Sequence, residues 1–148
     1  IKEGQRGISY LRLFGPYLAG AKKVKLVDPF VRYDYQIFNF MNFCETVAPS
    51  EGNVEVHLRT GADSDYQREE LEATFKDIQK RLVQDRGLLT YEFDDGTHDR
   101  MIEADTGWRI VLGRGLDIFQ KPEGKFTLGF VDQGKRKCKT TTVTYVKV

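Results

Sequence analysis

Three side chains that suit phosphate chemistry lie close together in the sequence. His98, Arg100 and Asp105 follow the spacing H-x-R-x4-D. The planar fork of a guanidinium can neutralise phosphoryl oxygens, and an imidazole can serve as a nucleophile or as a general acid. The alternative is structural: His98 and Asp105 cap a hairpin, and Arg100 pairs with a nearby carboxylate. The spacing is therefore compatible with three roles for these residues: a structural role, anion binding and catalysis.

A second copy of this spacing would supply a second histidine, and the chain offers no clean one. The only other histidine, His57, stands in His57-Leu58-Arg59, but Ser64 occupies the position that an aspartate would need. Strand alternation already explains His57 as a residue of a polar strand face. The chain has two histidines and no compact Cys/His cluster, so the sequence does not predict a zinc site. We therefore expect neither a metal nor a cofactor.

Further candidates for an anion site follow two predicted strands. Asp28 ends an apolar strand shortly before Arg32, and ligands in open α/β sheets favour this carboxyl edge, although Asp28 could equally satisfy backbone groups there. The backbone of Gly113-Arg114-Gly115 could face an anion after another strand. The expected phosphate ligands are Arg32, Arg100, Arg109, Arg114, Lys135, Arg136 and Lys137. The residues expected to support the site are Asp28, Trp108, Gly113 and Gly115.

Lysines and arginines also gather at residues 135–139 and at residues 22–25. Most charge runs of this kind are merely solvated. Beside an anionic surface, however, each cation can contribute on the order of 1 kcal/mol, which is enough for weak recruitment and marginal for stable anchoring. Both runs are therefore candidates for contact with an acidic partner.

The composition favours one compact domain. The 148 residues are 40% hydrophobic and 30% charged, with a net charge of +1, which argues against a uniformly basic coat for nucleic acid or membranes. No apolar run approaches the roughly 18 residues of a spanning helix, so we expect any membrane contact to be peripheral and the protein to be cytoplasmic. Cys44 and Cys138 are expected to be reduced thiols. Because the chain starts at Ile1 rather than Met, we expect a domain cut from a longer protein.

Apolar periodicity alternates between helix-like and strand-like along the chain. Helices are expected from Ser9 to near Gly20, at residues 33–48, and from Ser64 to Arg86, where Ser64 and Gln67 form a capping box. Strands are expected at residues 24–27, 54–59, 88–93, 126–131 and 140–148, with a hairpin at residues 100–112. This order predicts a single α/β domain with one mixed sheet flanked by helices.

Two blocks of the sequence carry a resemblance to a known family. The first comprises residues 9–10, 16–18, 27–32 and 40–45, and the second comprises residues 98–100, 107–108, 113–119 and 126–129. Together they resemble the phospholipase D-like domain at the C-terminus of microtubule-interacting-and-trafficking (MIT) domain proteins. The resemblance spans nearly the whole chain. It implies a phospholipase D-like fold over residues 1–148, usually without demonstrated catalysis.

The spacing H-x-R-x4-D is similar to the H-x-K-x4-D signature of phospholipase D-type phosphotransferases. In that signature the histidine attacks phosphorus, the lysine neutralises phosphoryl oxygens, and the aspartate orients the apparatus. The similarity implies that His98, Arg100 and Asp105 are the catalytic residues only if the chain is active. Animal relatives bind acidic phospholipid headgroups, self-associate as dimers and work with the ESCRT membrane-scission machinery. Prokaryotic relatives occur beside other modules, including ATPases.

These implications leave three functions open. The first is a non-catalytic, self-associating module that binds a phosphate-bearing partner, foremost acidic phospholipids at a membrane surface. The second is a dimeric phosphodiesterase, acting on lipid or nucleic acid, in which two copies of His98 meet across a two-fold axis. The third is a protein-interaction or dimerisation domain of a larger ATPase-type machine. The expected partners are acidic phospholipids, a second copy of the chain and other domains of the full-length protein, with nucleic acid as a less favoured alternative.

Overall fold

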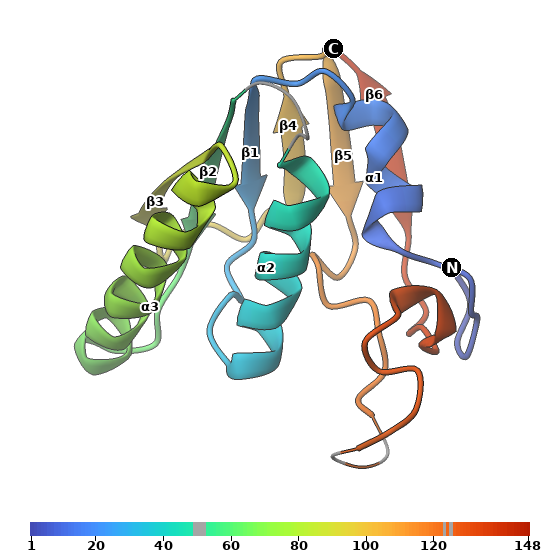
Figure 1. The fold of residues 1–148 in the computed structure, drawn as a ribbon. Coiled ribbons are helices and arrows are strands. Elements are labelled where there is room, and N and C mark those ends of the chain that lie inside the picture. Colours follow the sequence, from blue (N-terminus) through green and yellow to red (C-terminus); the bar gives the residue numbers. More distant parts are fainter. Residues whose placement is uncertain (49–52, 123, 125) are drawn as a thin grey trace.

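The computed structural model describes residues 1–48, 53–122, 124 and 126–148. Figure 1 shows its elements, which follow in the order α1 (Tyr10–Leu18), β1 (Lys23–Val27), α2 (Asp34–Val47), β2 (Val54–Thr60), α3 (Asp65–Gln84), β3 (Gly87–Phe93), β4 (Met101–Ala104), β5 (Trp108–Leu112) and β6 (Val143–Lys147). A short 3-10 turn at Gln133–Lys135 precedes the last strand.

One six-stranded mixed sheet forms the centre of the domain, in the order β3-β2-β1-β4-β5-β6. The strands β1, β2 and β3 run parallel to one another, and β4, β5 and β6 are added by antiparallel pairing. The three helices lie on one face of the sheet (Figure 1). The structure confirms the predicted α/β domain with a mixed sheet, and it shows that α1, α2 and α3 all cover the same face.

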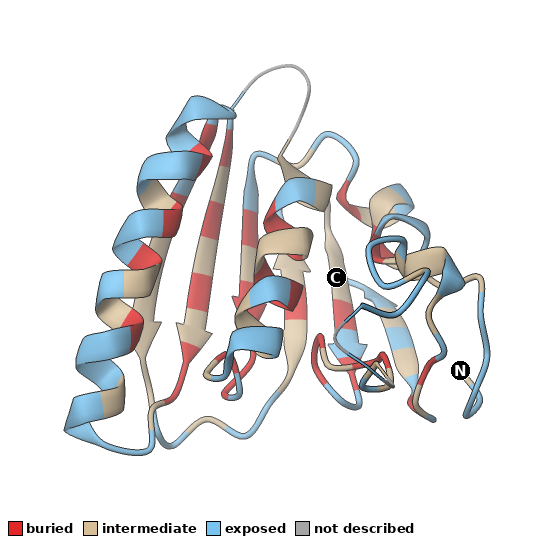
Figure 2. Ribbon diagram, turned by 60° about the horizontal axis from the view of Figure 1, so that its bottom comes forward, coloured by how far each residue is buried: buried red, intermediate tan, exposed pale blue. Residues whose placement is uncertain are grey.

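The apolar residues that predicted the strands pack against the helices. In β2, buried and half-buried residues alternate strictly, and Val56 and Leu58 are fully buried. The same core contains Phe40 of α2 and Phe75 of α3, whose ring centres lie 6.2 Å apart in an edge-on arrangement. Figure 2 shows buried residues in red along the sheet and on the helix sides that face it. Each large apolar side chain buried in this way stabilises the fold by about 1.5–3 kcal/mol.

Side-chain caps define where the first and third helices begin. Ser9 Oγ accepts a hydrogen bond from the backbone N–H of Arg12 at 3.1 Å, and Ser64 Oγ accepts one from Gln67 at 3.1 Å. Each bond satisfies a backbone donor that lacks a partner within its own helix. The predicted start of the third helix at Ser64 is therefore confirmed.

The predicted strand at residues 126–131 is wrong. These residues form turns, with Gly129 at a φ of 84°, and they pair with no strand in the described part of the chain. Phe126, Leu128 and Val131 are 90%, 98% and 96% exposed. Apolar alternation indicates a strand only where one face packs on a core, and here no face does.

Two kinds of feature are absent from the described residues. No helix among them has both the length and the apolar character that crossing a bilayer requires. No three His, Cys, Asp or Glu side chains in these ranges are grouped closely enough to hold a metal ion.

Candidate anion-binding site

A cavity of about 240 Å³ lies at the edge of the sheet where β1 and β5 end. Asp28 follows β1, and residues 113–117 follow β5. These two chain segments lie side by side below the sheet in Figure 1. Three residues predicted from the sequence, Asp28, Arg100 and Arg114, line this cavity. The other lining residues are Phe30, Val31, Gln36, Asn39, Leu116 and Asp117. The site thus lies at the carboxyl edge where open α/β sheets commonly bind ligands.

Asp28 joins the two chain segments that form the cavity. It is 4% exposed, and its two carboxylate oxygens accept hydrogen bonds from the backbone N–H groups of Phe30 at 3.0 Å and Leu116 at 3.1 Å. Burial raises the pKa of this carboxyl, while the two hydrogen bonds and the charge of Arg100 oppose the rise. Asp28 therefore holds together the two chain segments that line the cavity.

A glycine and a tyrosine hold the turn after β5 against Asp28. Gly115 has a φ of 61°, and a Cβ at this position would overlap Asp28 Oδ2. Tyr10 is fully buried and donates its hydroxyl hydrogen to the carbonyl of Leu116 at 2.5 Å. Burial raises the pKa of Tyr10 well above its usual value, so the hydroxyl remains a donor. These contacts fix the turn relative to β1.

Arg100 carries a positive charge that the surrounding protein does not neutralise at short range. Its guanidinium carbon lies 4.6 Å from the centre of the Phe30 ring, a position in which the ring face attracts a cation. Within the described residues, no carboxylate oxygen comes within ion-pair distance of this guanidinium. Stacking thus positions Arg100 and leaves its N–H donors available for an anion.

Arg114 lines the same cavity, whereas Arg32 lies beside it and is already paired. Arg114 donates from Nε to a backbone carbonyl at 2.9 Å and is otherwise exposed. Arg32 forms an ion pair with Asp63, and its guanidinium carbon lies 5.2 Å from the centre of the Phe30 ring. Phe30 therefore contacts both Arg32 and Arg100, but only Arg100 lines the cavity.

Two polar side chains of α2 also line the cavity, and neither is predicted from the sequence. Gln36 Oε1 accepts hydrogen bonds from the backbone N–H groups of Arg32 at 3.1 Å and Tyr33 at 3.0 Å, at the start of α2. Asn39 is buried next to the cavity. A spacing of three places Gln36 and Asn39 on one side of the helix, but isolated polar residues in an amphipathic helix give no ligand signal.

The structure does not bring the three residues of H-x-R-x4-D together. Arg100 comes just before β4 and Asp105 just after it, so the length of the strand separates them. Asp105 accepts hydrogen bonds from the backbone N–H groups of Lys22 at 3.0 Å and Lys23 at 3.2 Å, at the start of β1. His98 is exposed and does not line the cavity. Of the three, Arg100 alone belongs to it.

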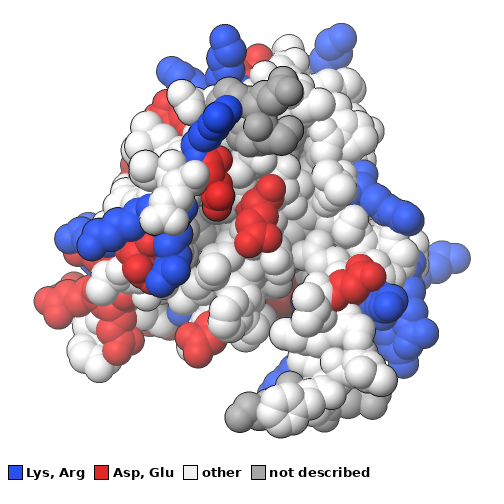
Figure 3. Space-filling view, viewed as in Figure 1, with Lys and Arg blue, Asp and Glu red and all other residues white. Residues whose placement is uncertain are grey.

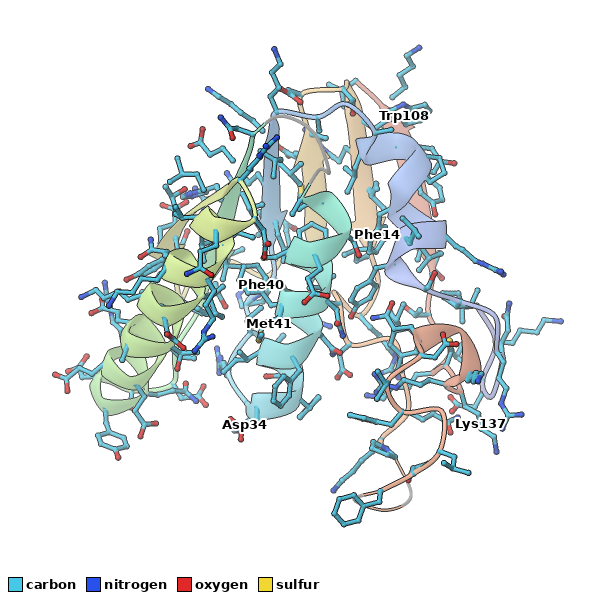
Figure 4. All side chains as sticks on the ribbon, in the orientation of Figure 1. Phe14, Asp34, Phe40, Met41, Trp108 and Lys137 are labelled. Carbon is cyan, nitrogen blue, oxygen red and sulfur yellow. The ribbon has the colours of Figure 1, made fainter. Side chains whose placement is uncertain are left out.

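Three other residues predicted for the site also lie outside the cavity. Arg109 points to the uncovered face of the sheet and pairs with Glu103 at 3.2 Å. Trp108 packs edge-on against Tyr17, with ring centres 4.9 Å apart, at the upper end of the sheet in Figure 4. Gly113 follows β5, and a Cβ there would come within 3.0 Å of a threonine hydroxyl oxygen.

The remaining predicted ligands form a second group, which we call the basic cluster. Lys135, Arg136 and Lys137 line a separate cavity of about 230 Å³ together with Arg6 and Lys121, which are not predicted from the sequence. Figure 3 shows Lys and Arg side chains in blue at the lower right of the molecule, and Figure 4 labels Lys137 in that region. Arg6 and Lys121 lie far apart along the chain, and only folding brings them together.

Arg136 differs from the other members of the basic cluster because aromatic rings hold it. Its guanidinium carbon lies 4.8 Å from the ring centres of both Phe119 and Phe130. Burial lowers the pKa of Arg136, and nearby groups that include Tyr10 and Asp117 oppose this effect. Asp117, one of these groups, also lines the first cavity.

Comparison with known proteins agrees with this architecture. Residues 7–147 match a family model described as the phospholipase D-like domain at the C-terminus of MIT. The chain is 35% identical over 145 residues to MIT domain-containing protein 1 of Mus musculus, a match that covers 97% of this chain and 58% of the relative. The chain thus spans somewhat more than half the length of that relative. The resemblance seen in the sequence is confirmed, and the chain belongs to the family of phospholipase D-like domains found at the C-terminus of MIT proteins.

Proposed function

We propose that this chain is a non-catalytic module that binds the phosphate of an acidic phospholipid at a membrane surface. The observation that carries the proposal is the presence of Arg100 and Arg114 in one cavity at the carboxyl edge of the sheet. Neither guanidinium has a carboxylate within ion-pair distance among the described residues. Guanidinium groups bind phosphate oxygens through paired N–H donors, and two such groups border the same space.

The acidic residues of the cavity are already engaged by the protein. Both oxygens of Asp28 accept backbone hydrogen bonds, and Asp117 pairs with Lys139 Nζ at 2.9 Å. A carboxylate that is paired in this way repels an incoming anion less than a free one does. The arginines therefore set the preference of the cavity for negative charge.

The size of the cavity favours a small headgroup. Its volume of about 240 Å³ lies below the roughly 300–1,000 Å³ of pockets that enclose drug-sized ligands. A phosphate and one small polar substituent would fill it, with the rest of the lipid outside.

A membrane explains the basic cluster as well as the cavity. Most residues that line the cluster and the cavity belong to the chain segments that follow β1 and β5, and these segments lie at the lower end of the molecule in Figure 1. Each lysine or arginine near an acidic leaflet contributes about 1 kcal/mol, so several weak contacts together support recruitment. A single soluble phosphate could occupy the cavity but could not contact all of these cations.

Hydrolysis is left out of the proposal for a geometric reason. A histidine nucleophile must reach the phosphorus atom, and His98 does not line the cavity that contains Arg100. Asp105 lies at the other end of β4. These placements favour binding over phosphodiester cleavage.

Vesicle sedimentation tests the proposal with a matched control. We expect the protein to sediment with phosphatidylcholine vesicles that contain phosphatidylserine and to stay in solution with phosphatidylcholine alone. Arg100→Ala and Arg114→Ala should each weaken binding about fivefold, the factor that corresponds to ~1 kcal/mol per cation. Arg109→Ala removes the same charge from the uncovered face of the sheet and should leave binding unchanged.

If wild type, Arg100→Ala and Arg109→Ala sediment equally with acidic vesicles, the cavity does not bind the lipid. Absence of binding to acidic vesicles would reject the membrane as partner. In that case, a titration of isotope-labelled protein with inorganic phosphate, monitored by NMR at residues around the cavity, distinguishes a soluble phosphate ligand from no anion ligand.

A further inference from the structure

Residues 126–131, which we call the apolar loop, present large apolar side chains to solvent on one projecting segment. Leu128 and Val131 are almost fully exposed, and Phe130 is partly exposed. The six residues carry no charge, and Figure 3 shows white side chains, which are neither basic nor acidic, at the bottom of the molecule, where Figure 1 places this segment. Contiguous exposed apolar surface of this kind marks a contact with another protein or with a membrane.

The apolar loop is attached to the domain at Phe130. Phe130 lies under Arg136, with the guanidinium carbon 4.8 Å from its ring centre. The backbone N–H of Phe130 donates to the carbonyl of Thr127 at 3.3 Å, which closes a turn. Leu128 and Val131, on either side of this attached ring, remain in solvent.

The basic cluster lies directly beside the apolar loop. Residues 127–130 line the same cavity as the five cations of the cluster. Peripheral membrane segments combine these two features, because apolar side chains enter the boundary of the acyl chains while cations remain among anionic headgroups. A protein partner with an acidic rim would also match the charge, but the loop is small and projecting rather than flat.

The geometry points to insertion of the apolar loop into the acyl-chain boundary of an acidic membrane, with the basic cluster at the headgroups. This inference rests on the proposed function and adds a second contact to it. The chain segments after β1 and β5, which line the cavity with Arg100 and Arg114, lie at the same end of the molecule (Figure 1), so one orientation on the membrane serves both contacts. The two contacts differ in salt dependence, because salt screens exposed charges but does not weaken apolar burial.

The double variant Leu128→Ser/Val131→Ser tests the insertion. We measure partition onto phosphatidylcholine vesicles containing phosphatidylserine at ~0.1 M and ~1 M NaCl, between which the Debye length falls from about 10 Å to about 3 Å. Wild type should retain part of its binding at high salt. The double variant should lose roughly tenfold or more in partition at high salt, because it no longer buries two apolar side chains. The control Leu11→Ser/Val83→Ser makes the same changes at exposed sites on α1 and α3 and should behave as wild type.

The position of the loop in the bilayer gives an independent measurement. In a Leu128→Trp variant, the fluorescence of the new tryptophan should be quenched by lipids that are brominated on their acyl chains. The natural Trp108, at the opposite end of the sheet (Figure 4), should show no such quenching in wild type. If Leu128→Trp is not quenched, the insertion is rejected even where vesicles are bound.

Failure of the insertion can be separated from failure of the proposed function. If Leu128→Ser/Val131→Ser binds vesicles like wild type at both salt concentrations while Arg100→Ala binds weakly, the cavity binds lipid and the loop does not insert. If wild type does not bind vesicles at all, both lipid binding by the cavity and insertion of the apolar loop are rejected. If the double variant halves the mass of the free protein in analytical ultracentrifugation, a second copy covers the loop, and the insertion is rejected.

Discussion

Gly115 lies directly against the carboxylate of Asp28, and a Cβ at Gly115 would overlap Asp28 Oδ2. The residue also has a φ of 61°, a conformation that a non-glycine residue adopts only with strain. We expect Gly115→Ala to lower the free energy of unfolding by about 2 kcal/mol or more. The same change should weaken vesicle binding, because the turn that carries Arg114 would move.

Urea unfolding followed by circular dichroism measures this effect. Gly96→Ala is the matched control, because Gly96 is exposed and a Cβ there would meet its nearest neighbour, Asp94, at an ordinary distance of 3.4 Å. The control should change stability by roughly 0.5 kcal/mol at most. Equal stability of Gly115→Ala and wild type would contradict the close packing between the turn and Asp28.

Asp28 should give the stability of the domain a recognisable pH dependence. Its pKa is raised by burial, so the native state holds the proton more tightly than the unfolded state does. The resulting stabilisation is present below the unfolded pKa of about 3.9 and is lost as the pH rises through the native pKa. Asp28→Asn has no such titration. It also replaces one of the two acceptor oxygens with a donor, which should cost about 1–3 kcal/mol.

The stability difference between wild type and Asp28→Asn should therefore be largest in acid and should narrow as the pH rises. Urea unfolding at a series of pH values starting near the unfolded pKa of Asp measures the difference. Asp99→Asn, at an exposed position near the site, controls for the loss of one carboxylate. A difference that widens with rising pH would mean that the pKa of Asp28 is lowered in the native state.

The sequence predicted the fold well where apolar periodicity and capping agreed. Ser64 and Gln67 marked the start of α3 because a cap is a local interaction between neighbours in sequence. The apolar loop at residues 126–131 shows the opposite case. Its apolar residues resemble a buried strand, and only tertiary structure shows that they face solvent.

The candidate site was only partly predictable, since its residues come from distant segments. Asp28, Arg100 and Arg114 each follow or precede a strand, and the register of β1, β4 and β5 brings them to one edge. Linear spacing suggested that Asp105 acts with Arg100, but β4 places the two at its opposite ends. Arg109 has a suitable type and position in sequence, yet strand alternation directs it to the uncovered face. The expected self-association stays a prediction.

Both cysteines should be unreactive while the domain is folded. Cys44 is 2% exposed and Cys138 is 0% exposed. Burial raises the pKa of Cys44 to about 12 and also raises the pKa of Cys138, so little of the nucleophilic thiolate forms. We expect Ellman's reagent to modify neither thiol near neutral pH and to modify both after unfolding in urea. Rapid modification of either thiol in the native protein would show that the core around it opens.

On the uncovered face of the sheet, Glu92 connects His57 and Arg59. Its carboxylate accepts hydrogen bonds from Arg59 Nε at 2.8 Å and from His57 Nε2 at 3.1 Å. These bonds lower the pKa of Glu92, so ionised Glu92 stabilises the fold above its unfolded pKa of about 4.3. This contribution disappears as the pH falls through the native pKa.

We therefore expect Glu92→Gln to lower the free energy of unfolding near neutral pH, by at most about 1 kcal/mol because the pair is partly exposed and screened. The loss should shrink as the solution becomes acidic. Denaturant unfolding of both proteins at neutral and acidic pH checks the sign, with Glu69→Gln on the exposed side of α3 as the control. A loss that grows in acid would show that Glu92 is not held ionised by His57 and Arg59. A loss of vesicle binding in Glu92→Gln would place the uncovered face, rather than the cavity with Arg100, against the membrane.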